Sequence, residues 1–224
     1  MNRGQPKLIV FSGIDNAGKS TQINCLMQRL RVRGFRPVYF WSRGGYTGPF
    51  NLLKSALRKI FGKKIIPSGR TADRQRAMQR SLVARLWLWL AICDLILVYG
   101  IYFRYLIWRG KTIIADRYLF DTWIDFTLNF PMIHFDQWFL WRFLQIILPR
   151  PTQLFLLLIP VDESIQRGKL KNEPFPDSPE ILEKRLCFYQ QYSETKDTVT
   201  FDCLAPIESI EQKIWFTLFT ENKT

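Results

Sequence analysis

The chain has 224 residues and a hydrophobic fraction of 47%, enough for one substantial domain with a large core and little room for a second. Four widely separated cysteines and a single histidine argue against a disulfide framework, a zinc cluster or a histidine-based catalytic triad. A net charge of +13 favours partners that carry negative charge, such as phosphorylated substrates or an anionic surface, and also fits a solvated surface without a role.

A glycine-rich loop follows the first predicted strand, the apolar run at residues 8–11. From Gly13 to Ser20 the chain has the spacing of a phosphate-binding loop, and a helix is predicted from Lys19 to about residue 33. Backbone N–H groups of such a loop and the positive end of the helix dipole surround a polyphosphate, so the sequence predicts a nucleoside triphosphate site. Ser20 would bind Mg²⁺. The residues predicted to hold the nucleotide are Gly13, Asn16, Ala17, Gly18, Lys19, Ser20 and Thr21.

The next predicted strand is Pro37–Trp41, and Arg43 follows it directly. The guanidinium fork of an arginine at a strand end suits a monophosphate held through two oxygens. A basic segment then occupies residues 53–64, and a further helix is expected to begin near Thr71.

The middle of the chain is unusually apolar. Residues 86–103 carry one charge, that of Asp94, over a length at the lower limit of a membrane span. Because a carboxylate is costly in lipid, we interpret this segment as a buried helix, packed in a core or in a subunit interface. An aromatic cluster at residues 135–144 has helical spacing, and we assign it first to core or dimer packing. Docking on a membrane surface stays open as an alternative.

A second polar motif, Asp116-Arg117-Tyr118, ends the predicted strand at residues 111–115. Ligand-facing residues of a parallel sheet lie at such strand ends. A carboxylate there can hold Mg²⁺ through water, and an arginine can bridge the transferring phosphates. Together with Arg43, these residues predict a donor phosphate pocket beside an acceptor phosphate pocket.

The last third of the chain continues the alternation of strands and helices. Strands are predicted at residues 151–159 and 198–201, and helices at residues 178–195 and after Pro206. Nearly all-apolar strands that alternate with helices are typical of an α/β fold with a parallel sheet covered on both faces. Without a repeat or a linker, residues 1–224 are expected to form a single domain.

Taken together, these motifs resemble the thymidylate kinase family. The resemblance implies a P-loop three-layer sandwich with a short lid, the use of ATP and Mg²⁺, and a homodimer. The widely separated cysteines indicate a cytoplasmic location, with membrane association as an alternative. It covers roughly residues 7–215 and rests on the loop at 11–22, on Arg43, on 109–118, on the spacing from Asp94 to Asp116, and on a basic lid at about 165–177 with the helix after it.

The resemblance also implies a role for each matching residue. The implied catalytic residues are Asp15, Lys19, Arg117 and Arg167. Lys169 and Lys171 would bind the donor phosphates together with the glycine-rich loop. The metal is held by Ser20 and Asp116, and the acceptor is bound by Asp15, Arg43, Asp94, Asp116, Arg117 and Tyr118.

Two departures from the family concern the acceptor. Leu95 follows Asp94 where the family commonly has an arginine that helps to read thymine, and Ser12 stands where many members have glutamate. The resemblance implies transfer of the γ-phosphoryl of ATP to a nucleoside monophosphate, with dTMP to dTDP as the first candidate. The alternatives are a kinase of a non-nucleotide phosphorylated acceptor, and a nucleotide-binding switch or membrane-associated interaction protein without transfer. The basic surface carries no recognition motif, so no specific nucleic-acid partner is expected.

Overall fold

The computed structural model describes residues 6–42, 81–172, 176–195 and 198–220. The chain divides into two compact units. The sheet unit comprises Met1–Trp41, Leu106–Ile124 and Arg150–Thr224, and the helical unit comprises Ser42–Tyr105 and Asp125–Pro149. The interpretation of residues 1–224 as one kinase domain stays a prediction.

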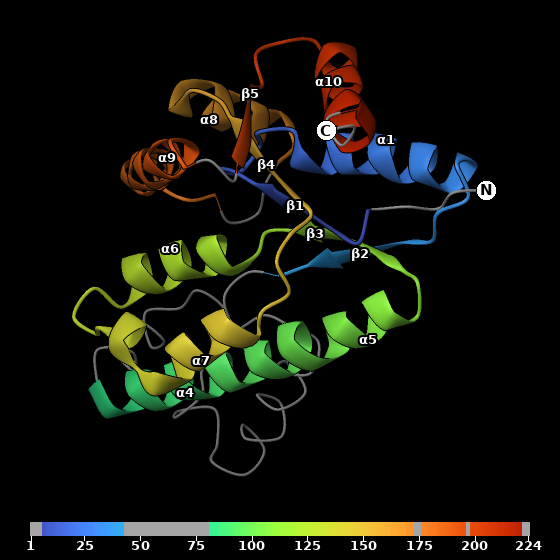
Figure 1. Cartoon of the computed structure of the whole chain (residues 1–224). Helices are drawn as coiled ribbons and strands as arrows, with labels where there is room; N and C mark the ends of the chain where they lie inside the picture. The colour runs from blue at the N-terminus through green and yellow to red at the C-terminus, as the bar shows by residue number, and fades with distance from the viewer. Residues whose placement is uncertain (1–5, 43–80, 173–175, 196–197, 221–224) are drawn as a thin grey trace. The chain divides into compact units, whose positions relative to one another are not determined.

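A five-stranded sheet forms the centre of the sheet unit, with every strand pair parallel and the order β2-β3-β1-β4-β5 (Figure 1). β1 and β3 are buried along their whole length, as nearly all-apolar strands of a parallel sheet should be. This topology confirms the predicted α/β fold. The strands are β1 (Leu8–Ser12), β2 (Pro37–Trp41), β3 (Thr112–Asp116), β4 (Gln153–Leu158) and β5 (Thr198–Asp202).

Helices of the sheet unit pack directly on these strands. α1 (Lys19–Val32) contacts β1, β2 and β3, and α9 (Pro179–Ser193) contacts β4 and β5. α10 (Ile207–Thr220) lies beside α1 (Figure 1), where the guanidinium of Arg29 lies 4.5 Å from the centre of the Trp215 ring. α1, which follows the glycine-rich loop, is therefore packed against the sheet and against α10.

The helical unit contains most of one long helix. α4 (Ser81–Leu95) continues as the π-helix η1 (Ile96–Tyr102) and then as α5 (Phe103–Trp108), whose last residues belong to the sheet unit. One helix in the described part of the chain, Leu82–Trp108, is long and apolar enough to cross a membrane by length and composition, and half of its most apolar window is buried. The predicted apolar helix is thus present and longer than expected, and Asp94 is buried on it with 5% exposure.

Two short helices also belong to the described part of the helical unit. The aromatic cluster is divided between the 3₁₀ turn η2 (Phe135–Gln137) and α7 (Phe139–Ile147), because Trp138 between them is extended. Edge-to-face packing joins Phe135 to Phe126 at 5.3 Å and to Trp141 at 5.0 Å between ring centres. Phe135 and Trp141 therefore supply core packing, whereas Phe139 and Phe143 of the same cluster are exposed.

Two helices were not predicted from the sequence. One is α6 (Leu119–Asn129), and the other is α8 (Val161–Leu170), which occupies the first part of the expected lid. α8 has acidic residues in its first turn and basic residues in its last turn, and the interaction of these charges with the helix dipole stabilises the helix. Of the expected lid, residues 173–175 lie outside the described residues, as does the helix start near Thr71.

Candidate active site

The glycine-rich loop between β1 and α1 has the backbone that its glycines require. Gly13 has a φ of +140°, and a Cβ there would lie 2.1 Å from the carbonyl oxygen of Leu157 on β4, so no other residue fits. Gly18 has a φ of +86° and caps α1, without a hydrogen bond from a side chain to the first turn. The N-terminus of α1 thus presents its backbone N–H groups and positive dipole end to the loop.

Lys19 is the buried cation of this loop. Its Nζ donates hydrogen bonds to the carbonyl oxygens of Gly13 at 3.0 Å and Ile14 at 2.6 Å. Burial, with a smaller contribution from the charge of Arg117, lowers the pKa of Lys19 from 10.5 to about 8. An anion placed at the loop would oppose that shift, so the loop is electrostatically suited to a phosphate.

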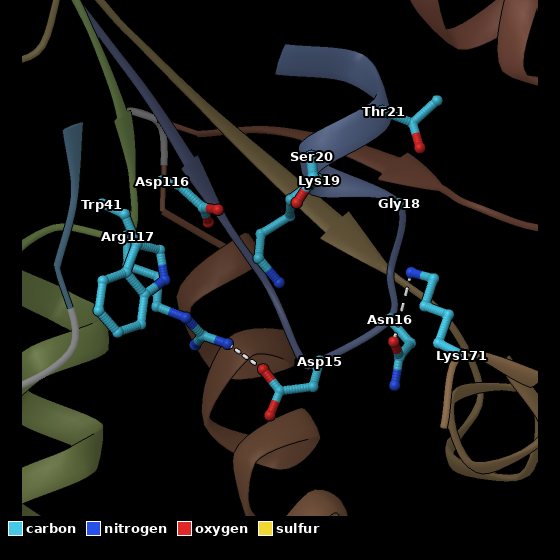
Figure 2. Close-up of a pocket in the computed structure, with 10 residues that line it drawn as sticks. All are labelled: Asp15, Asn16, Gly18, Lys19, Ser20, Thr21, Trp41, Asp116, Arg117 and Lys171. Carbon is cyan, nitrogen blue, oxygen red and sulfur yellow. Dashed lines mark hydrogen bonds and ion pairs between the residues drawn. The ribbon is translucent and has the colours of Figure 1, made fainter. Parts of the chain in front are cut away.

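A cavity of about 190 Å³ opens beside the loop in the sheet unit (Figure 2). Side chains from the loop, from α1, from the ends of β2 and β3 and from the end of α8 converge on it. They bring three cations and two carboxylates to one small space. Its lining residues are Asp15, Asn16, Gly18, Lys19, Ser20, Thr21, Trp41, Asp116, Arg117 and Lys171.

Asp116 closes β3 with its carboxylate in the wall of this cavity. Its Oδ2 accepts a hydrogen bond of 3.2 Å from the hydroxyl of Tyr39, whereas its buried Oδ1 has no hydrogen-bond partner among the described residues. Burial, and then the charge of Asp116, raise the pKa of Tyr39 to about 12. The hydroxyl therefore stays a donor, and the second carboxylate oxygen is left to accept from a ligand or a metal-bound water.

The described residues contain no cluster of three or more His, Cys, Asp or Glu side chains that could hold a metal ion by themselves. Mg²⁺ commonly binds through one or two protein oxygens together with substrate phosphates and water. Ser20 and Asp116 both line the cavity and are oxygen ligands of this kind. The residues present therefore fit a magnesium ion that arrives with a polyphosphate.

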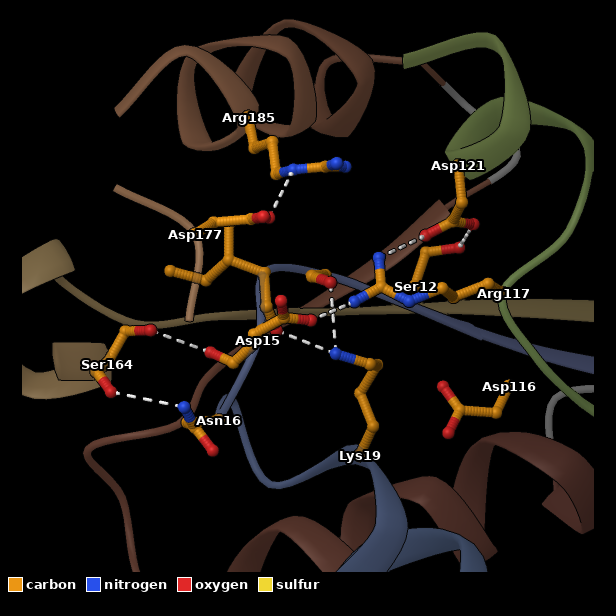
Figure 3. A network of polar contacts seen from close by, with 12 residues as sticks. Ser12, Asp15, Asn16, Lys19, Asp116, Arg117, Asp121, Ser164, Asp177 and Arg185 are labelled. Carbon is orange, nitrogen blue, oxygen red and sulfur yellow. Dashed lines mark hydrogen bonds and ion pairs between the residues drawn. The ribbon is translucent and has the colours of Figure 1, made fainter. Parts of the chain in front are cut away.

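Arg117 lies between two carboxylates (Figure 3). One amino group of its guanidinium pairs with Asp15, and the other lies 3.6 Å from Oδ1 of Asp121 and donates to the hydroxyl of Tyr189 at 3.3 Å. Its side chain is 4% exposed, and its backbone adopts a φ of +77°, which is rare for a residue with a side chain. Such a conformation persists where the surroundings fix it, and it is found preferentially at functional sites.

The carboxylate of Asp121 organises these contacts (Figure 3). Oδ2 accepts a hydrogen bond of 2.6 Å from the hydroxyl of Ser12, which Figure 3 shows. Oδ2 also accepts one of 3.0 Å from the backbone N–H of Tyr118, and Oδ1 accepts one of 2.6 Å from the hydroxyl of Tyr189. Sequence reasoning missed Asp121 and Tyr189. The available signal was the position of Asp121 four residues after Arg117, in the first turn of α6. The network makes Asp121 a positioning residue for the Arg117 guanidinium.

We therefore expect Asp121→Asn to disturb Arg117 and the stability of the fold together. Removing one charge of a buried pair costs about 3–5 kcal/mol, so the free energy of unfolding in a urea titration should fall by an amount of this order. Asp136→Asn, at an exposed position of the helical unit, is the control and should leave it unchanged. Equal stability of the two variants would show that the Asp121 charge contributes nothing to the network.

The loop is also tied to α8. Ser164 donates a hydrogen bond of 2.8 Å to the carbonyl oxygen of Asp15, and Asn16 donates one of 3.3 Å to the carbonyl oxygen of Ser164. Lys171, directly after α8, donates one of 3.4 Å to Oδ1 of Asn16 and lines the cavity (Figure 2). α8 therefore positions both the loop and one of the three predicted lid cations.

The structure does not bring the other two predicted lid cations to the cavity. Arg167 donates to Glu163 at 2.6 Å and to the carbonyl oxygen of Cys203 at 3.1 Å. Lys169 is exposed on α8 and is not among the lining residues. Both belong to a regular helix, so their direction is set by that helix and not by a free loop.

The remaining predicted site residues fall into three groups. Ala17 and Tyr118 are buried beside the loop and the Asp121 network, and neither lines the cavity. Asp94 belongs to the helical unit. Arg43 lies outside the described residues, so its predicted contact with the acceptor phosphate stays a prediction.

The family model described as Thymidylate kinase matches residues 11–214 of this chain. No curated protein matched it. The matched range includes every residue that lines the cavity.

Proposed function

The chain belongs to the thymidylate kinase family, and from this premise we propose that it transfers the γ-phosphoryl group of ATP to a small phosphorylated acceptor, with dTMP as the first candidate. One observation carries the proposal. The glycine-rich loop with Lys19, Asp116 and Arg117 all line one cavity, and Oδ1 of Asp116 has no hydrogen-bond partner among the described residues. Phosphoryl transfer needs this combination, because its catalysis consists of positioning and of stabilising negative charge.

On the donor side, the loop and α1 would bind the ATP phosphates. Backbone N–H groups of the loop would donate to the phosphates, and Lys19 would exchange its two carbonyl acceptors for phosphate oxygens. Ser20 and Asp116 would hold Mg²⁺, which neutralises phosphate charge when bound. Lys171, already on the cavity wall, would add a cation to the same charge.

On the acceptor side, Arg117 would hold the phosphate that receives the phosphoryl group. Its pairing with Asp15 and Asp121 fixes the direction of the guanidinium before the acceptor arrives. Asp15 would exchange part of this pairing for a contact with the acceptor. Such preorganisation lowers the barrier, because little rearrangement is left for the reaction itself.

The neighbourhood of Asp94 favours a second acceptor class. Leu95, which stands where the family commonly carries a base-reading arginine, is fully buried and apolar. Loss of a bidentate base contact removes several kcal/mol of discrimination. We therefore keep a non-nucleotide phosphorylated acceptor as the alternative to dTMP. A binding protein without transfer would have no use for the paired Arg117, and we rank it below both.

The proposal is tested by ADP release from ATP–Mg²⁺ with purified full-length protein. The acceptors are dTMP, dUMP, other nucleoside monophosphates and a series of sugar and lipid phosphates. Stimulation by dTMP supports the first candidate, and stimulation by a non-nucleotide phosphate alone supports the second. ATP binding without stimulation by any acceptor would contradict transfer.

ATP binding is expected to take up protons at alkaline pH. Because the pKa of Lys19 is about 8 in the free protein, this side chain is largely neutral at pH 9, and bound phosphates restore its charge. Calorimetry in buffers of different ionisation enthalpy should show uptake of up to about one proton at pH 9 and little at pH 7. Lys19→Met is the control, and the same uptake in that variant would assign the proton to another group.

A further inference from the structure

A tryptophan stands in the wall of the otherwise polar cavity. Trp41 is the last residue of β2, and it is the one aromatic residue among the described residues that line this cavity. It is 44% exposed, although tryptophan is highly buried on average. The contacts with phosphates and Mg²⁺ proposed above involve charged groups, a hydroxyl and backbone N–H groups, and they leave this indole ring without a role.

The sheet places Trp41 beside the residues assigned to the acceptor. Trp41 is paired with Asp116 in the parallel register of β2 and β3, and Arg117 follows Asp116 directly. Residues two positions apart on a strand point to the same face of the sheet. Since the hydroxyl of Tyr39 on β2 reaches the carboxylate of Asp116, Trp41 lies on this same face, at the carboxyl ends of the strands.

The glycine-rich loop lies on the other side of the cavity. β2 is an edge strand, and β3 separates it from β1, the strand that leads into the loop. Figure 2 shows Gly18 and Lys171 across the cavity from Trp41 and Asp116. A molecule that extends from Arg117 away from the donor phosphates therefore passes the ring of Trp41.

The cavity is too small for a whole acceptor. Its volume of about 190 Å³ is below the roughly 300–1,000 Å³ of pockets that enclose a small molecule. It has room for phosphoryl groups and a metal ion, while the body of the acceptor extends past the border of the cavity. The part of the acceptor next to its phosphate would then lie against the indole of Trp41.

We propose that Trp41 is a specificity-determining residue whose ring selects an acceptor with a sugar ring next to its phosphate. This inference rests on the proposed function, because that function assigns Arg117 to the acceptor phosphate. The C–H groups on one face of a sugar can pack on the face of the indole, where the π-system is negative. The hydroxyl groups of the sugar stay in contact with water. Nucleoside monophosphates and hexose phosphates both contain such a ring, so this contact is common to both acceptor classes.

Calorimetric binding to purified full-length protein tests the inference without ATP, so that no transfer occurs. The probes are dTMP, glucose 6-phosphate and glycerol 3-phosphate, the last of which has no ring. We expect at least one ring-containing phosphate to bind about tenfold more tightly than glycerol 3-phosphate, a usual gain from stacking on an aromatic side chain. Tighter binding of dTMP would identify a nucleotide, and tighter binding of glucose 6-phosphate would identify a sugar phosphate.

Variants of Trp41 assign this preference to the indole ring. Trp41→Leu should remove most of the preference, because leucine has no flat face, and Trp41→Phe should retain part of it. The affinity for ATP should stay that of the wild type in both variants, which a general disturbance of the site would not allow. Trp108→Leu is the matched control, since Trp108 is a 79% exposed tryptophan of the sheet unit that does not line the cavity.

Three results would overturn the inference: no tighter binding of either ring-containing phosphate by the wild type, an unchanged preference in Trp41→Leu, or an equal loss of affinity for ATP in that variant. Failure of transfer is a separate result. Ring-selective binding that depends on Trp41, without a phosphorylated product when ATP is added, would contradict the proposed function and retain the Trp41 contact. Transfer with the same acceptor preference in wild type and Trp41→Leu would contradict the inference alone.

Discussion

Replacement of Lys19 by methionine is expected to lower kcat for phosphoryl transfer by about 10²–10³-fold, the usual loss when one preorganised charge donor is removed from the transition state. Methionine retains much of the lysine volume, so the loop keeps its packing while it loses the buried charge. Steady-state kinetics with saturating ATP–Mg²⁺ and acceptor measure the effect. Lys213→Met on α10, which removes an exposed lysine of the same unit, is the control.

The free energy of unfolding of Lys19→Met shows whether its loss of activity comes from catalysis or from a folding defect. The pKa of Lys19 is about 8 in the folded state and 10.5 in the reference state, so between these values the unfolded chain binds more protons than the folded chain. The Lys19 contribution is therefore unfavourable below pH 8, and it is relieved as pH rises from 8 to 10.5. We expect the stability of the wild type relative to Lys19→Met to increase over this window. A variant that is inactive and also unstable at pH 7 would contradict this account.

The second large effect is expected at Arg117. Arg117→Lys keeps a positive charge and loses the planar fork that contacts Asp15 on one side and Asp121 and Tyr189 on the other. We expect kcat/KM for the acceptor to fall by about 10²-fold or more, with a smaller change in KM for ATP. Initial rates over a matrix of acceptor and ATP concentrations separate the two.

Arg29→Lys is the matched control for this substitution. Arg29 pairs with Glu211 at 3.3 Å and is 39% exposed, so its loss should leave both KM values unchanged. An Arg117→Lys variant with unchanged acceptor kinetics would remove Arg117 from the acceptor site. An equal loss for ATP and acceptor would place it between both substrates.

The elements that follow from periodicity and glycine chemistry agree with the structure. β2 has the predicted bounds, and α1 begins at Lys19, directly after Gly18, whose left-handed backbone conformation is one that glycine adopts readily. The loop and Asp116 were found from the sequence, because phosphate binding imposes a fixed local spacing and because residues at the carboxyl ends of parallel strands share one edge.

Of the network around Arg117, only Asp121 had a local signal, its position four residues after the arginine. Ser12, Asp121 and Tyr189 come from a strand and two helices that are far apart along the chain, and no local pattern links them. The helical structure of α8, in the first part of the predicted lid, was not predicted, although its order of acidic and then basic residues is a helical signal. The network around Arg117 and the position of α8 both depend on tertiary packing. Residue spacing along the chain carries no information about such packing.

The most direct test of phosphoryl transfer follows a label on the γ-phosphoryl group of ATP through a single turnover, with protein in excess and the acceptor panel present. We expect the label to appear on a phosphorylated acceptor in the wild type and to stay on ATP in Lys19→Met. Label released as inorganic phosphate, at a rate that no acceptor changes, would contradict transfer and identify the cavity as a site of nucleotide hydrolysis.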